Sequence, residues 1–331
     1  MRSALGWAGR NGSRVVIASV VLGFAFPALS AAARPWLVAS IFGFTLGALL
    51  KFDPACLQRE FVQVSRNVAM VAWATFGVPL LVWGLILVVR PGPGLAQGML
   101  FWALVPPSGA CVAFAVLLGL RVPLALLATV VATAAAPFYM PWMATAMGGF
   151  ELSLDPAAMS LKLLAVIGGA WIASMLLKRF ASSLVRANPD AVTGVAVASL
   201  FMAGLGSMRG MLARFNADPA QTLLLLALAY ALLGGVQLLS ALIFRRCGAS
   251  ASLTAGLISS TRTITLAWVV LGDRALPAAD VFFGCVMVAK YTMPGILRPI
   301  VSRLLAAEAA GTPVPAAATP AVPVRLPAAK T

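Results

Sequence analysis

The chain alternates between long runs of apolar residues and short polar connections. Most runs are close to the ~20 residues that a helix needs to cross the hydrocarbon core of a bilayer. We count ten such runs, at about 15–29, 35–50, 67–89, 95–120, 122–147, 158–177, 191–208, 220–244, 249–271 and 277–301. The pattern predicts an all-α membrane protein in which residues 1–305 form one ten-helix domain. The remaining residues, 306–331, are rich in Ala and Pro and predict a disordered tail.

Two of the ten runs contain residues that should interrupt a helix. The fourth run holds Pro106-Pro107-Ser108-Gly109, and two adjacent prolines remove two backbone donors. The ninth run holds the polar stretch from Ser259 to Thr263. We therefore expect helix breaks at Pro106, Pro107 and Ser259.

The two interrupted runs belong to an internal duplication. Residues 106–141 align without a gap on residues 259–294, 153 positions later, with an ordered Leu-Gly-x-Arg match and a Met-Pro match. The repeats would cover about residues 10–150 and 156–305. Because each repeat has five crossings, the second is inverted relative to the first. Inverted repeats with broken helices in corresponding positions are typical of alternating-access transporters, with the site at the breaks.

Basic residues sort by side of the membrane. Of 24 Lys and Arg, 16 lie at the two termini and in the even-numbered connections and 6 in the opposite ones. We expect the protein to lie in the inner (plasma) membrane of the cell. The positive-inside rule then predicts that both termini face the cytoplasm. The net charge of +15 is spread over short connections, which argues against a nucleic-acid partner. Residues 1–33 also fit a cleavable signal peptide, and that alternative stays open.

Composition narrows the chemistry further. The chain is 61% hydrophobic and has no histidine, and its nine acidic residues fall in connections or at helix ends. The usual metal sites and acid/base pairs of an enzyme cannot be assembled in the membrane from such a set. We expect no enzyme activity, cofactor or metal. The four cysteines have no metal-ligand spacing, and we expect free thiols.

Several short motifs resemble those of the bile acid:sodium symporter family. They are Phe42-Gly43-Phe44-Thr45-Leu46-Gly47, then Val78-Pro79-Leu80-Leu81, then the break at Pro106–Gly109, and finally the segment Leu118–Leu124. The likeness covers about residues 10–305, although no motif is intact. It implies a panel domain and a core domain, with two broken helices crossing in the core.

The family's sodium ligands do not carry over. Its glutamine in the third helix corresponds to Ala74 and its Ser-Asn pair to Cys111 and Val112; in the ninth helix its glutamate corresponds to Ile258 and its glutamine to Arg262. A guanidinium at such a site would repel sodium. The resemblance thus implies the fold of the family, but not its coupling to sodium.

Arg262 and Lys290 are the two cations expected deep in the membrane. A charged residue there usually faces a cavity or a partner. Arg262 could bind an anionic substrate, or it could bond to carbonyls, replace the lost cation and stiffen the crossover. Lys290 could exchange a proton, act as a fixed charge, or extend toward an edge. The candidate substrate-binding residues are Arg262, Lys290, Ser260, Thr261, Thr263, Ser108, Gly109 and Thr129.

The leading hypothesis is a secondary transporter of a small organic anion, working as a uniporter, an exchanger or a proton-coupled carrier. The alternatives are a channel-like or sensory protein on the same fold, or a sodium-coupled symporter with a relocated ion site. A homo-oligomer remains open. On the anion-binding interpretation, Arg262→Ala should abolish binding and leave the protein folded.

Overall fold

The computed structural model describes residues 12–51, 64–148 and 155–311. Within these ranges the chain is helical, and its β-structure is a single isolated bridge. Seven described helices are long and apolar enough to cross a membrane: Pro27–Leu50, Ser65–Val89, Val122–Gly148, Pro156–Phe180, Pro189–Ala217, Pro219–Ile243 and Pro277–Glu308. The chain is an all-α membrane protein. Pro79 lies inside the continuous helix Ser65–Val89, at the start of its segment α7 (Val78–Val89) and directly after the π-helical stretch Trp73–Gly77.

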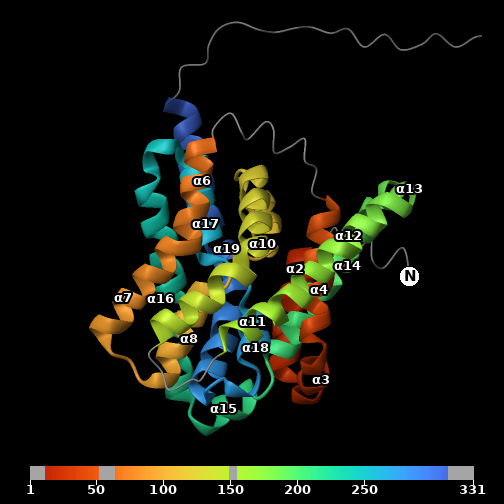
Figure 1. Ribbon diagram of the computed structural model, residues 1–331. Helices are drawn as coiled ribbons and strands as arrows, with labels where there is room; N and C mark the ends of the chain where they lie inside the picture. Colours follow the sequence, from red (N-terminus) through yellow and green to blue (C-terminus); the bar gives the residue numbers. More distant parts are fainter. Residues whose placement is uncertain (1–11, 52–63, 149–154, 312–331) are drawn as a thin grey trace, which may run out of the picture.

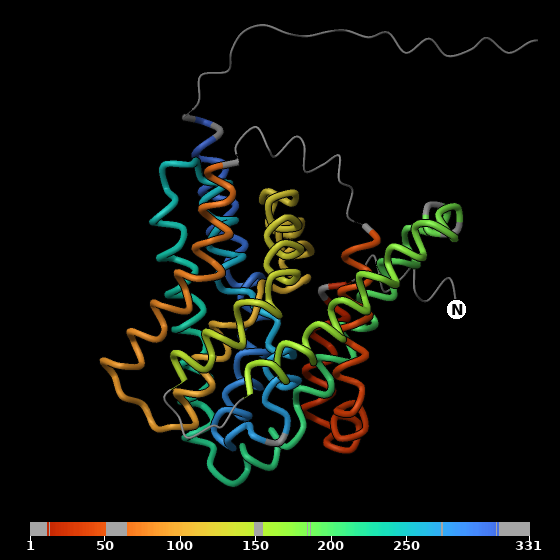
Figure 2. Tube along the Cα trace, viewed as in Figure 1, coloured from red at the N-terminus to blue at the C-terminus, as the bar shows by residue number. Residues whose placement is uncertain are grey.

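One set of helices packs around α14 (Pro189–Ser207), and we call it the α14 group. The elements that contact α14 are α2 (Gly12–Ala25), α3 (Pro27–Ala33), η1 (Arg34–Trp36), α4 (Leu37–Lys51) and α13 (Ser182–Ala187). The helix formed by α11 (Pro156–Leu163), η4 (Leu164–Gly168) and α12 (Gly169–Phe180) joins the group because η4 and α12 pack on α4, whereas α11 packs on α10 (Val122–Gly148) of the second set. Red and green segments, far apart in the sequence, lie side by side in this group (Figure 2).

The second set, the crossover group, contains both interrupted helices. Its members are α6 (Val64–Ala72), the π-helical stretch η3 (Trp73–Gly77), α7, α8 (Pro93–Leu104), α9 (Ala110–Leu118), α10 (Val122–Gly148), α15 (Met211–Ala217), α16 (Pro219–Ile243), η5 (Arg245–Cys247), α17 (Ala249–Ser260), α18 (Ile264–Leu271), η6 (Gly272–Arg274) and α19 (Pro277–Gly311). Helix α19 continues past Leu305 to Gly311, so the start of the predicted disordered tail is helical. The remainder of that tail lies outside the described residues.

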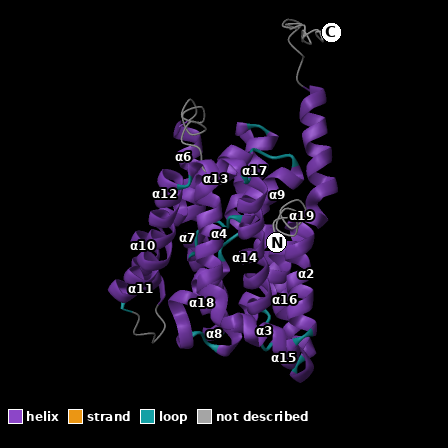
Figure 3. Ribbon diagram, turned by 90° about the vertical axis from the view of Figure 1, so that its right-hand side faces the viewer, coloured by secondary structure: helices purple, strands orange, loops and turns teal. Residues whose placement is uncertain are grey.

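The two groups are close together at one end of the molecule and diverge toward the other. Helices α3, α15 and α18 lie near one end, which we call the α15 end (Figure 1). Toward the opposite end, the α13 end, α12 and α14 lean away from α6 and α17. In the view from the side, α3 and α15 again lie at one end and α6, α13 and α17 toward the other (Figure 3).

Glycines allow α4 to approach α14 closely. A Cβ atom built on Gly43 would lie 2.2 Å from the hydroxyl oxygen of Ser199, and one on Gly47 would lie 2.7 Å from the Cβ of Ala196. Both are below any real contact distance. Small residues at such positions let helix backbones pack tightly where lipid offers no hydrophobic driving force.

We expect Gly47→Val to destabilise the α14 group by about 1–3 kcal/mol, because the added side chain must push α4 away from α14. The matched control is Gly84→Val in α7, where an added Cβ meets no atom within 4 Å. Thermal unfolding midpoints of the purified variants in detergent provide the measurement. Equal midpoints for the two variants would contradict the close packing of α4 on α14.

Candidate functional site

The two helix interruptions lie against each other. Helix α8 ends at Leu104 and α9 begins at Ala110, while α17 ends at Ser260 and α18 begins at Ile264. An antiparallel bridge joins Pro107 to Arg262. Pro106 and Pro107 lie in the first interruption, as the sequence predicted. Ser259 does not mark the second, because it lies in the last turn of α17 and the interruption begins at Thr261.

The bridge answers a problem that the breaks create. Each interruption frees backbone groups in a region with no water, where an unpaired polar group costs several kcal/mol. The amide of Ser108 donates to the carbonyl of Thr261 at 2.8 Å, and the amide of Thr263 donates to the carbonyl of Pro106 at 2.9 Å. The hydroxyl of Thr263 adds a bond to the carbonyl of Pro107 at 3.2 Å. Each break thus supplies donors for the other.

Arg262 bonds to three further carbonyls and is fully buried. Its Nε donates to the carbonyl of Ser259 at 2.7 Å, its Nη1 to that of Val105 at 3.0 Å, and its Nη2 to that of Ala74 at 2.6 Å. Two of these oxygens belong to the C-terminal ends of α17 and α8, where the helix dipole concentrates negative charge. The third belongs to the π-helical stretch η3. The guanidinium therefore clamps three helices together.

Lys290 is also buried, with 4% of its surface exposed. Its ammonium donates to the hydroxyl of Ser108 at 3.0 Å and lies 5.1 Å from the ring centre of Tyr291. The hydrogen-bond partners found for Lys290 and Arg262 in the described part of the chain are neutral oxygens. Two positive charges thus lie in the crossover without a carboxylate beside them.

A pocket lies next to this crossover, between α4 of the α14 group and α9 and α10 of the crossover group. It is small and partly open to the surroundings, with a cavity volume of about 10 Å³, which is about the room that one water molecule needs. Hydroxyls and a glycine form one part of its lining and aromatic rings another: Thr45, Gly109, Thr129, Thr133, Phe44 and Trp171. The lining offers both polar and apolar contacts, but the pocket must widen before it can hold an organic molecule, since ligand pockets usually enclose about 300 Å³ or more.

The structure divides the predicted site residues into two sets. Gly109 and Thr129 line the pocket. Ser108 connects the pocket to Lys290, since it precedes Gly109 and its carbonyl accepts a bond from Thr129 at 3.4 Å. The others line the crossover instead: Arg262, Thr261, Thr263 and Ser260, whose hydroxyl donates to Gln237 at 3.2 Å.

Thr45 is a site residue that the sequence reasoning did not single out. It lines the pocket, is 5% exposed, and its hydroxyl is buried without a hydrogen-bond partner among the described residues. In a helix a threonine hydroxyl can bond to the carbonyl four residues back. The oxygen is covered in this conformation, so a bound molecule would reach it only after the pocket widens. The sequence signal was a lone threonine between apolar residues, which is common in membrane helices.

No family model matches the chain, and no curated protein is similar enough to it to count as a relative.

We expect Arg262→Ala to lower the free energy of unfolding by about 3–5 kcal/mol, because it leaves three buried carbonyls without their charged donor. Arg262→Lys should recover only part of this, since an ammonium lacks the planar fork that reaches several acceptors. Arg245→Ala, which removes an exposed arginine, is the control. Unfolding in mixed detergent and denaturant measures the differences. Normal stability of Arg262→Ala with loss of anion binding would instead support the anion-binding interpretation.

Proposed function

We propose that the protein is a secondary transporter that moves a small organic anion across the inner membrane by alternating access. The observation that carries the proposal is the pair of hydrogen-bonded helix interruptions, with two unneutralised cations, beside a pocket between two groups of helices. Interrupted helices that meet in this way are used by transporters to build a site from backbone groups and helix ends. The fold would resemble that of the bile acid:sodium symporters.

The proposed topology has ten crossings. Seven long helices, the two broken pairs α8–α9 and α17–α18, and the shorter apolar helix Arg14–Ala25 together supply that number. The broken pairs occupy the fourth crossing of each proposed repeat, and each is followed by a long helix, α10 or α19. We keep both termini in the cytoplasm, as the distribution of basic residues favours.

An anion is the favoured substrate because of the charge around the pocket. Lys290 bonds to Ser108, and the next residue, Gly109, lines the pocket and is the N-cap of α9. The positive end of the α9 dipole therefore faces the same region as the ammonium. A carboxylate or sulfonate there would gain charge-assisted contacts. Its apolar part would lie against Phe44 and Trp171.

The Arg262 clamp supports transport without sodium. In transporters with broken helices, freed carbonyls commonly coordinate sodium or take part in proton coupling. Here three such carbonyls already hold a guanidinium. Of the two interpretations of Arg262, this geometry favours the resident cation that stiffens the crossover. Its charge would still add to the potential that attracts an anion.

Uptake into liposomes tests the transport function. A thermal-shift screen of carboxylates and sulfonates identifies a binding anion, and its labelled form is then followed in proteoliposomes. We expect saturable uptake with counterflow that persists when choline replaces sodium at constant pH and membrane potential. Loss of uptake in choline would indicate a relocated sodium site. Non-saturating flux that follows the electrical driving force would indicate a channel.

Thr45→Val tests the pocket. The change removes an unpaired hydroxyl, so the free energy of unfolding should stay the same or rise slightly. Affinity for the anion found in the screen should nevertheless fall about tenfold or more, because a hydrogen bond to a charged group is lost. The control is Thr222→Val, because the Thr222 hydroxyl already bonds to the carbonyl of Asp218 within its own helix. Unchanged affinity in Thr45→Val would place the anion elsewhere.

Lys290→Met should also weaken binding of the anion. It should flatten the pH dependence of transport if the Lys290 ammonium carries a proton.

A further inference from the structure

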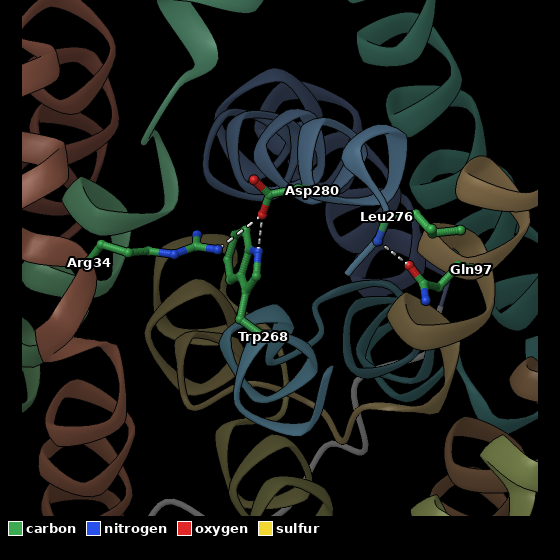
Figure 4. Close-up of polar contacts among 5 residues, drawn as sticks. All are labelled: Arg34, Gln97, Trp268, Leu276 and Asp280. Carbon is green, nitrogen blue, oxygen red and sulfur yellow. Dashed lines mark hydrogen bonds and ion pairs between the residues drawn. The ribbon is translucent and has the colours of Figure 1, made fainter. Parts of the chain in front are cut away.

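A second polar cluster lies at the α15 end, outside the pocket and the crossover. Arg34 in η1 belongs to the α14 group, whereas Trp268 in α18 and Asp280 in the first turn of α19 belong to the crossover group. Arg34 donates to a carboxylate oxygen of Asp280 at 3.1 Å (Figure 4). The indole of Trp268 donates to the same oxygen at 2.5 Å.

The arginine is held by more than the ion pair. Its Cζ atom lies 4.7 Å from the ring centre of Trp268, so the guanidinium also makes a cation–π contact. The two charged side chains are 21% and 38% exposed, and water therefore screens them only in part. The aspartate receives one donor from each group of helices, and the tryptophan orients it.

The start of α19, which carries Asp280, is held in place by other members of the crossover group. Gln97 of α8 accepts a bond from the amide of Leu276 at 2.8 Å and donates to the carbonyl of Arg274 at 3.3 Å (Figure 4). These bonds secure the turn that leads into α19. The Trp268–Asp280 bond then joins α18 to α19. The contact of Arg34 is the one in this cluster that spans the two groups.

We propose that Arg34 and Asp280 form a latch that holds the two groups together at the α15 end. The inference rests on the proposed function, because a latch matters only if the groups move. Thr45 lies eleven residues after Arg34, or about 16 Å along a helix at 1.5 Å per residue. Helix α4 runs from η1 toward the α13 end, where the groups diverge (Figure 1), so Thr45 lies on that side of the latch. The latch proposal takes this structure as the conformation accessible from the α13 end, and it requires the latch to separate before the pocket becomes accessible from the α15 end.

Side-specific cysteine labelling tests the latch without a substrate. The reporter is Thr133→Cys, in a protein whose Cys56 and Cys247 are replaced by serine; Cys111 and Cys285 are buried and stay. Membrane vesicles of each orientation are treated with a membrane-impermeant maleimide, so that labelling from the α15 end and from the α13 end is measured separately. We expect the reporter to be labelled mainly from the α13 end.

Three variants are compared on this background. Arg34→Ala removes the cation, and Asp280→Asn removes the charge but keeps an acceptor for Trp268. The exchange Arg34→Asp with Asp280→Arg restores opposite charges. The control is Asp218→Asn, because Asp218 lies at the same end but bonds to the amide of Gln221 in its own helix at 2.9 Å.

Both single variants should raise the labelling rate from the α15 end about two- to fivefold, the size expected for a partly exposed ion pair. The exchanged pair should lower it again, and the control should leave it unchanged. Unchanged labelling in both single variants, with normal elution on size exclusion, would overturn the latch. If only the latch proposal is wrong, labelling stays unchanged in the single variants while saturable uptake persists. If the transport proposal is wrong, saturable uptake is absent from the unmodified protein as well.

Discussion

Backbone groups that cannot reach water set the main constraint on this protein. Two helices are broken in the middle of the molecule, and each break leaves carbonyls that need a donor. The bridge between Pro107 and Arg262 satisfies part of that need, and the guanidinium of Arg262 satisfies three carbonyls more. Breaks, bridge and arginine are therefore interdependent. The position of the pocket beside them follows from this arrangement.

Features that depend on local chemistry could be predicted from the sequence. Adjacent prolines remove donors wherever they occur, so the first interruption was found at Pro106 and Pro107. The second interruption begins at Thr261, two residues after the predicted Ser259, because Ser259 and Ser260 remain in the last turn of α17. Apolar runs of sufficient length gave the all-α membrane class. The internal duplication and the exact number of crossings remain predictions.

Partners that come from distant helices could not be predicted. Arg262 stood out in the sequence, yet its contacts with Ala74 and Val105 span 188 and 157 residues. Thr45 is distinguished only by the missing partner of its hydroxyl, which no sequence pattern reveals. Arg34 was counted as one of several basic residues in connections. Its contact with Asp280 depends on how the two groups of helices meet.

The covalent attachment of the guanidinium to the chain has an energetic consequence. A metal ion at a crossover can leave, and its concentration on each side of a membrane then contributes work to the transport cycle. The charge of Arg262 is present in every state of the protein and has no gradient. Arg262 would therefore contribute the same positive charge to the crossover whether the carrier is loaded or empty. Any uphill movement would have to draw on a second solute, a proton or the membrane potential, and without one of these the substrate would simply equilibrate.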